Sequence, residues 1–422
     1  MPISENISNV RRDGRIIIAM IFLTSVALAI FGLVFNQARL WVIRVELQNS
    51  GDAAVLAATS VLVDDDLLRG TLCQNPSGIP DLLDKARLEA NIYAGHNPVN
   101  ARLFQMHLNP TNRADGDIVF GTLDQPRSKT FILATNVINA SNDELAKINT
   151  IRVNARLLRS RGNAPGLIFP QFTAQSQHDV IARSSATLDR DVIGFRPIVV
   201  PSIPLAPLAL LADYSLSEAK SWNKQIEGKA GADDFIFDRI TKQFTKDASG
   251  DGLPEFSAVV DLDGTKLADA NVGLLFIGTG AGDPDRFDEL LRQLNTGVTK
   301  KDLQPTGGQF VLQANNQLEV TGDKTWSPSA SDLHDTLVAL NSSGAVRIWP
   351  LYCSFNGTNP VVCGFVAARV ANVESLKAGD PLRFTLQPTM ISSGSAVTDN
   401  TQRGVNGVPV VNLYICKVRL VE

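Results

Sequence analysis

The sequence predicts an α+β protein in which a long N-terminal transmembrane helix continues into an antiparallel-sheet lobe, and a second mixed, β-rich lobe follows. Ile16–Phe35 is a run of twenty uncharged, mostly apolar residues. As a helix with a rise of about 1.5 Å per residue it spans roughly 30 Å, the thickness of a bilayer's hydrocarbon core. No proline interrupts the sequence from Ile3 to Pro76, and segments of alternating apolar and polar residues follow. We therefore divide the chain into a cytoplasmic tail (1–15), a transmembrane helix (16–35), an α+β domain (36–195) and a β-rich domain (196–422).

The charges beside the span predict its orientation. Three arginines lie among residues 11–15, before the span, whereas Arg39 and Arg44 follow it. By the positive-inside rule, the N-terminus is then cytoplasmic and both domains lie outside the cytoplasm. A cleaved signal peptide ending at Ala27-Leu28-Ala29 is the alternative. An uncleaved anchor is favoured over it, because cleavage there would leave the apolar stretch 30–35 as a new N-terminus.

After the span, apolar residues keep a helical spacing as far as Leu62, so one helix of about 70 Å is expected. A face of small and apolar side chains runs along its second half and consists of Leu47, Ala53, Ala54, Ala57, Ala58 and Val61. Such a face allows close approach, so we expect it to pack against partner subunits or against the chain's own sheet. A solvated stalk, in which the alanines only raise helix propensity, is the alternative.

A second helix is predicted at Asp81–Tyr93, where apolar residues at helical spacing lie between charged ones. Beyond it the pattern has a period of two, which predicts strands at Asp117–Gly121, Thr130–Ala134, Thr150–Ala155 and Asp179–Ala186. Since the connections are too short for helical crossovers, we expect an antiparallel sheet with the helices packed on it. The second domain is expected to contain helices at Ser217–Ile226 and Pro284–Leu294, and strands at Phe256–Leu262, Val272–Ile277 and Val410–Val421.

The composition argues against several classes of function. A net charge of −4, with 19% charged residues, is not basic enough for nucleic-acid binding. The sequence has no P-loop, Gly-x-Ser-x-Gly or His-Glu-x-x-His motif. The glycines of Gly278–Gly282 do not have the spacing of a dinucleotide-binding loop. We therefore expect a non-enzymatic protein without an organic cofactor.

Two of the four cysteines predict a disulfide. Cys353 and Cys363 flank an Asn-Gly turn between two apolar segments, and a hairpin there would bring the two sulfurs together in an oxidising compartment. Cys73 and Cys416 could pair or remain thiols. A zinc site is a weaker alternative, because there is no Cys-x-x-Cys and the four histidines stand apart.

One candidate metal site, for Mg²⁺, follows the apolar segment 208–212. Asp213, Ser215 and Ser217 match the Asp-x-Ser-x-Ser pattern of a von Willebrand A metal-ion-dependent adhesion site, and one carboxylate with two hydroxyls offers hard oxygen ligands. The prolines at 201, 204 and 207 argue against the central strand that such a site needs. A helix N-cap formed by one of the serines is the alternative.

A second candidate metal site, for Ca²⁺, consists of Asp247, Ser249, Asp251 and Glu255. The spacing approximates the start of a calcium loop, but the position of the closing glutamate holds Ala258. An acidic surface turn is the alternative interpretation.

A short motif lies where the span passes into the following helix. Arg44–Asn49 reads Arg-x-x-Leu-Gln-Asn, and Asp52-Ala53-Ala54 with further alanines follows it. With these residues, Arg39–Leu62 resembles the TadE/TadG-like family of the Tad (tight adherence, Flp) pilus-assembly system. Ser50-Gly51 and Val55 depart from the alanines that the family has there. Fainter similarity continues at Asn97–Val99, Asp117–Gly121, Ile151–Val153, Gly250–Glu255 and Gly273–Gly278.

The resemblance implies a single-pass protein of the bacterial inner membrane, with Ile16–Phe35 in contact with lipid and the body in the periplasm. It also implies that 36–195 is a TadG-like domain, that the partners are pilus-assembly or other envelope proteins, and that there are no catalytic residues. The oligomeric state stays open. A metal-dependent adhesion module and an anchored hydrolase or sugar-binding protein are the alternative functions.

Overall fold

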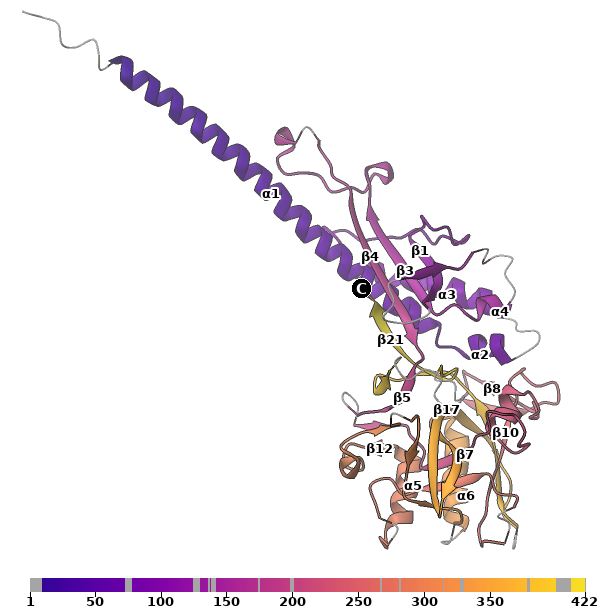
Figure 1. The fold of residues 1–422 in the computed structure, drawn as a ribbon. Coiled ribbons are helices and arrows are strands. Elements are labelled where there is room, and N and C mark those ends of the chain that lie inside the picture. Colours follow the sequence, from indigo (N-terminus) through magenta and orange to yellow (C-terminus); the bar gives the residue numbers. More distant parts are fainter. Residues whose placement is uncertain are drawn as a thin grey trace, which may run out of the picture.

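The structure is a computed structural model that describes residues 10–421 apart from 73–77, 124–129, 136, 138–141, 174, 198–200, 266–267, 281, 314, 327–329, 378–379 and 400–410. A long N-terminal helix projects from one end of a body with two β-containing lobes (Figure 1). The helices are α1 (Val10–Val61), α2 (Asp65–Leu72), α3 (Ile79–His96), α4 (Asn142–Leu145), α5 (Arg286–Thr296) and α6 (Ala330–Ser343). Shorter helical turns are η1 (Arg159–Arg161), η2 (Pro170–Phe172), η3 (Asn223–Glu227) and η4 (Gln304–Thr306).

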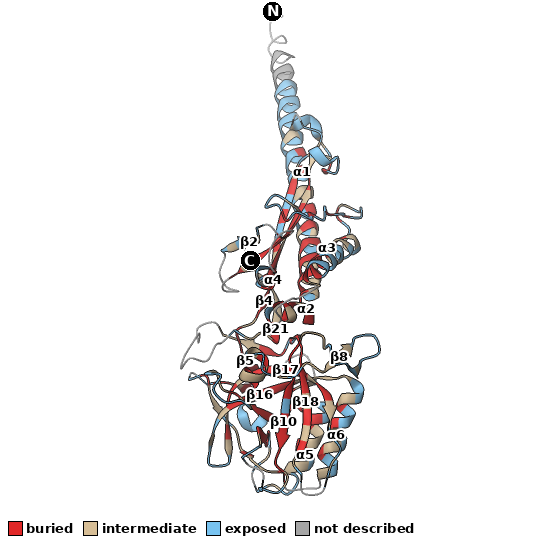
Figure 2. Ribbon diagram, turned by 90° about the vertical axis from the view of Figure 1, so that its right-hand side faces the viewer, coloured by how far each residue is buried: buried red, intermediate tan, exposed pale blue. Residues whose placement is uncertain are grey.

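The first half of α1 presents large apolar side chains to its surroundings. Phe22 and Leu23 are 70% and 71% exposed, and Figure 2 shows this half of the helix in pale blue. Among the described residues, α1 is the one helix long and apolar enough to cross a membrane. Exposure of so many apolar side chains to water is unfavourable. The length of this half of the helix and its apolar surface are those of a membrane-spanning helix.

The second half of α1 is buried along one stripe. The stripe consists of Ile43, Leu47, Gly51, Ala54 and Ala58, and it is continued by Leu62 directly after the helix; Ser50, Val55 and Thr59 are buried beside it. The spacing of three and four residues within the stripe places its members on one face of the helix. That face lies on the strands β3 and β4, and α3 packs alongside it. A Cβ at Gly51 would lie 2.8 Å from Ser184 Oγ, so the glycine lets the helix approach the sheet closely.

The first lobe contains a sheet with the strand order β19-β21-β4-β3-β1-β2. Its strands are β1 (Ile118–Leu123), β2 (Phe131–Leu133), β3 (Thr150–Leu157), β4 (Val180–Asp189), β19 (Ile391–Ser392) and β21 (Ile415–Val421). The edge pair β19–β21 is parallel and the other pairs are antiparallel. The four strands predicted between residues 117 and 186 coincide with β1 to β4, and the predicted antiparallel pairing of these four is confirmed.

The strand β21 joins this first sheet from the far end of the sequence. It pairs with β4, with Lys417 opposite Asp189 and Val421 opposite Ser185. The C-terminal end consequently lies beside α1 and β4 (Figure 1). The division at residue 195 assigns this strand to the second domain, whereas its pairing is in the first lobe. Alternation of side chains identifies a strand, but it does not identify the edge that the strand joins.

The second lobe is built on an eight-stranded sheet in the order β10-β18-β17-β16-β7-β11-β15, with β14 paired to β17. Its strands are β7 (Leu208–Leu211), β10 (Phe256–Val260), β11 (Val272–Leu275), β14 (Leu318–Glu319), β15 (Gly322–Asp323), β16 (Val346–Asn356), β17 (Asn359–Val373) and β18 (Leu382–Pro388). Trp222, Trp326 and Trp349 are fully buried in its core, and α6 packs on β17. Smaller sheets contain β5 (Val192–Phe195), β6 (Ser202–Ile203), β8 (Phe235–Asp238), β9 (Gln243–Lys246), β12 (Val298–Thr299), β13 (Phe310–Val311) and β20 (Ala396–Thr398).

Two expectations for the second lobe are wrong. The predicted helix at Ser217–Ile226 is replaced by turns followed by the π-helical turn η3. The prolines before Leu208 do not prevent an interior strand, because β7 lies between β16 and β11. Pro207 precedes the first residue of that strand, so its missing N–H falls outside the strand, and its carbonyl accepts a hydrogen bond from Leu275 N at 2.9 Å.

Candidate functional site

The small-residue face of α1 divides into two faces with different surroundings. Leu47, Ala54 and Ala58 are fully buried against the chain's own sheet and α3. Ala53, Ala57 and Val61 are only half-buried, and their spacing of four residues aligns them along the helix. The first set therefore supports the fold. The second set keeps part of its surface exposed, although Val61 also packs against the core, and we call it the open strip.

Polar side chains fix the rotation of α1 on the lobe. Ser50 Oγ donates to the carbonyl of Ala94 on α3 at 3.2 Å. Gln48 Nε2 donates to Ser184 Oγ on β4 at 3.0 Å. These bonds act on opposite flanks of the buried stripe, so the helix cannot turn about its axis without breaking them.

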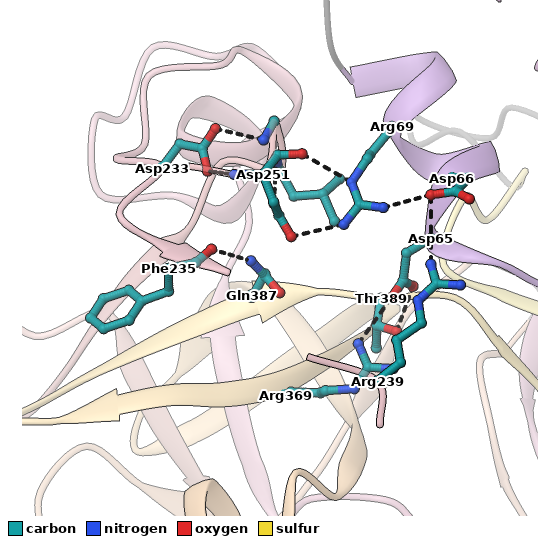
Figure 3. Close-up of polar contacts among 12 residues, drawn as sticks. Asp65, Asp66, Arg69, Asp233, Phe235, Arg239, Asp251, Arg369, Gln387 and Thr389 are labelled. Atoms are coloured by element: carbon teal, nitrogen blue, oxygen red, sulfur yellow. Dashed lines mark hydrogen bonds and ion pairs between the residues drawn. The ribbon is translucent and has the colours of Figure 1, made fainter. Parts of the chain in front are cut away.

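The short helix α2 joins the two lobes through charged side chains (Figure 3). Arg69 on α2 forms ion pairs with Asp66 at 2.6 Å and with Asp251 of the second lobe at 2.8 Å. A second ion pair has the charges reversed: Arg239 of the second lobe donates to Oδ1 of Asp64, which directly precedes α2, at 2.7 Å. Each side of the junction thus contributes both a carboxylate and a guanidinium group.

Asp65 is the buried centre of this junction. Its Oδ2 lies 3.1 Å from Arg369 Nη1 on β17, and its Oδ1 accepts hydrogen bonds from Thr389 Oγ1 at 2.7 Å and from Met390 N at 2.9 Å. The residue is only 7% exposed. A buried carboxylate needs such partners, because removal from water is costly without them.

The first predicted metal set is brought together in space. Ser215 Oγ and Ser217 Oγ lie 2.9 Å apart directly after β7, and Ser217 Oγ donates to Asp213 Oδ2 at 2.8 Å. The same carboxylate accepts the N–H groups of Ser215, Ser217 and Glu218. Hydrogen bonds from the Ser215 hydroxyl and from these N–H groups hold the pKa of Asp213 well below its usual value. The arrangement is that of a capped turn, because donors of the chain itself occupy both carboxylate oxygens.

The second predicted metal set is dispersed. Asp247 accepts hydrogen bonds from Ser249 within its own turn, whereas Asp251 is paired with Arg69. Among the residues that the structure describes, no group of three or more His, Cys, Asp or Glu residues is placed to hold a metal ion.

Glu255, the fourth member of that set, faces a different part of the second lobe. Its carboxylate accepts the N–H groups of Asp234 and Phe235 at 2.9 Å and 2.7 Å. Burial, together with the nearby charges of Asp233 and Asp234, raises the pKa of Glu255 to about 7, although these N–H bonds act to lower it. The residue therefore closes a loop of the chain.

The predicted disulfide between Cys353 and Cys363 is not formed, and both cysteines carry free thiols. They lie on the paired strands β16 and β17, where the register shifts between Leu351 and Ser354. Because of these irregularities neither cysteine has a directly opposed Cα partner. The neighbouring Cys363 thiol lowers the pKa of Cys353 to about 7. Cys416 is also a buried free thiol, and Cys73 lies outside the described residues.

A cavity of about 270 Å³ in the second lobe was not predicted from the sequence. Tyr414 Oη donates to Glu227 Oε1 at 3.4 Å, and Asn223 Nδ2 donates to Oε2 at 3.0 Å. Burial raises the pKa of Glu227. These side chains come from distant segments, and the π-helical turn that positions Glu227 has no sequence signature. Both carboxyl oxygens of Glu227 are thus already bonded to side chains of the chain itself.

Comparison of the chain with family models, with curated proteins and with solved structures finds no match. The function assigned to the chain therefore rests on its own geometry. The features with the clearest physical meaning are the exposed apolar half of α1, the open strip at Ala53, Ala57 and Val61, and the charged junction at α2.

We predict that Asp65→Ala lowers the free energy of unfolding by about 3 kcal/mol, because it leaves the guanidinium group of Arg369 without its carboxylate partner in a buried site. The matched variant Asp66→Ala removes a more exposed carboxylate and is expected to cost less than about 1 kcal/mol. Denaturant unfolding of the detergent-solubilised protein measures both. Equal losses in the two variants would contradict the special role of Asp65.

We predict that Asp213→Ala destabilises the second lobe by about 1 to 2 kcal/mol through loss of the turn cap, and that millimolar Mg²⁺ or Ca²⁺ leaves the melting temperature of the natural chain unchanged. Asp238→Ala, which removes a carboxylate that caps the turn at Ile240 and Thr241, is the matched control. A metal-induced rise in melting temperature that disappears only in Asp213→Ala would favour the adhesion site instead.

Proposed function

We propose that this chain is a non-enzymatic, single-pass protein of the bacterial cell envelope that acts through protein contacts in Tad/Flp-type pilus assembly or surface attachment. The observation that carries the proposal is the continuity of α1. Its exposed apolar half has the length of a membrane span, and its second half is buried in the first lobe. The helix is therefore both the membrane anchor and a structural part of the body.

The orientation follows from the flanking charges. The arginines among residues 11–15 favour a cytoplasmic N-terminus in the inner membrane, with both lobes in the periplasm. The resemblance of Arg39–Leu62 to TadE/TadG-like proteins supports a role beside other pilus-assembly or envelope proteins.

The open strip at Ala53, Ala57 and Val61 is the proposed contact surface for such a protein. It lies on the continuation of the anchor and begins 18 residues beyond Phe35, which is about 27 Å of helix. Its small side chains allow another helix to approach closely. The junction at α2 then holds the second lobe in a defined position relative to this strip.

Metal-dependent adhesion is a second candidate, favoured by the proximity of Asp213, Ser215 and Ser217. For a metal ion to bind there, it would have to displace the backbone N–H groups that now donate hydrogen bonds to the Asp213 carboxylate. The metal titration of the Asp213→Ala variant distinguishes it from assembly.

For the anchor, we predict that a cysteine at position 240 is reached from outside the inner membrane. Ile240 is 93% exposed between β8 and β9, so Ile240→Cys should react with a membrane-impermeant maleimide in spheroplasts. Ser4→Cys, in the N-terminal tail, should react only after lysis. The natural chain, treated in the same way, gives the background of maleimide labelling at its own four cysteines. The reverse pattern would contradict the orientation, and release of the protein by alkaline carbonate would contradict the anchor.

For the contact surface, we predict that Ala57→Arg abolishes pilus-dependent attachment of cells while protein level and melting temperature stay near those of the natural chain. Ala57 is half-buried, so an arginine there can reach water. Ala54→Arg forces a charge into a fully buried position and should cost more than about 4 kcal/mol, with loss of folded protein. Normal attachment by Ala57→Arg cells would refute the proposed surface.

A further inference from the structure

The loop Leu167–Thr173 lies against the end of the membrane span. It leaves the first sheet between β3 and β4, and its base is closed by the bridge between Gly166 and Gln177. It extends beside α1 in the direction of the N-terminus, and both ribbon views show it there (Figures 1 and 2). The turn η2 within this loop contacts α1.

Specific contacts hold the loop at this level of the helix. Asn36, which is only 3% exposed, donates from Nδ2 to the Phe169 carbonyl at 2.9 Å. Its Oδ1 accepts the N–H groups of Ile168 and Phe169, each at 3.0 Å. The Phe172 ring lies against Gly32, where an added Cβ would be 2.4 Å from the Phe172 Cδ2 atom. The glycine therefore makes room for the ring.

These contacts define the depth of the loop. Gly32 precedes the last apolar residue of the span, Phe35, by three positions, which corresponds to about 4.5 Å of helix. The Phe172 ring therefore lies at the level of the outermost part of the apolar segment. The first charged side chain of α1 beyond that segment is Arg39.

The side chains of the loop suit a lipid interface. The stretch 166–177 has no Asp, Glu, Lys or Arg. Ile168 is 48% exposed and Phe172 is 37% exposed, although both are large and apolar. Trp41 on α1, six positions beyond the span, is 66% exposed, and tryptophan prefers the level of the lipid headgroups.

We propose that the loop Leu167–Thr173 inserts into the outer interface of the membrane that α1 crosses, with Ile168 and Phe172 in contact with lipid. The partner is the bilayer itself, because the loop is continuous in space with the span. This inference rests on the proposed membrane anchor. A second contact beside the helix would prevent the body from swinging about a single point and would fix its orientation to the membrane plane.

The test uses the full chain in vesicles and an environment-sensitive nitrobenzoxadiazole probe on introduced cysteines. Lipids with a doxyl group near the headgroup should quench the probe at Ile168→Cys by about twofold, as expected for an interfacial group. Ile240→Cys, in the second lobe, should not be quenched. Leu28→Cys, within the span, should be quenched most by lipids that carry the doxyl group deep in the acyl chain. The labelled natural chain provides the background.

The outcomes separate the loop from the anchor. If Leu28→Cys is quenched and Ile168→Cys behaves like Ile240→Cys, the loop proposal is overturned and the anchor stands. If Leu28→Cys is not quenched, the anchor fails as well. Adding Gly32→Leu to Ile168→Cys should displace the Phe172 ring and weaken the quenching at Ile168 without changing that at Leu28, whereas unchanged quenching would argue against the Gly32 contact.

Discussion

The structure depends on the unbroken backbone hydrogen bonding of α1, which runs from Val10 to Val61. In a continuous helix the angular position of every side chain is set by the period of 3.6 residues. The exposed apolar side chains of the first half of α1 and the stripe that enters the first lobe are therefore fixed relative to each other. A break between them, such as a proline, would leave two elements with independent orientations.

The short helix α2 fixes the orientation of the second lobe relative to α1 as well. This short helix follows α1 after a tight turn, and its acidic first turn meets Arg239 and Arg369 of the second lobe. Asp65 is buried there and has hydrogen bonds to both oxygens. The three parts of the molecule, namely span, first lobe and second lobe, are thus linked through elements that are adjacent in sequence.

Local patterns in the sequence predict local structure well. The helical spacing from residue 43 to 62 predicts α1, and the period of two predicts β1 to β4, because these signals arise from burial of one face of each element. The boundaries of the hairpin β16–β17 also agree with the Asn-Gly turn. These local patterns do not show which segments that are far apart in the sequence contact each other in the fold. The pairing of β21 with β4 and the cavity at Glu227 depend on contacts between segments that are far apart in the chain.

The candidate sites show the same limit. The spacing of Asp213, Ser215 and Ser217 correctly places the three side chains together, but it does not show that backbone N–H groups occupy the carboxylate. The predicted disulfide is not formed, although the turn does bring the Cys353 and Cys363 thiols next to each other across the β16–β17 pair. The bulge at this point of the pair leaves no clear trace in composition. For the charged junction at α2, the run Asp64-Asp65-Asp66 was visible, but its arginine partners on other segments were not.

The return of the chain to the first sheet has a consequence for biogenesis. Arg419 on β21 is bound to Asp189 on β4 at 2.9 Å, across 230 positions of sequence. During synthesis the edge of β4 stays uncovered until the second lobe has been made, and an uncovered edge invites pairing with other chains. In the membrane-anchored protein that we propose, the chain stays in that state after its N-terminal helix has entered the bilayer, so this late-closing edge would be a substrate for a chaperone at the membrane surface.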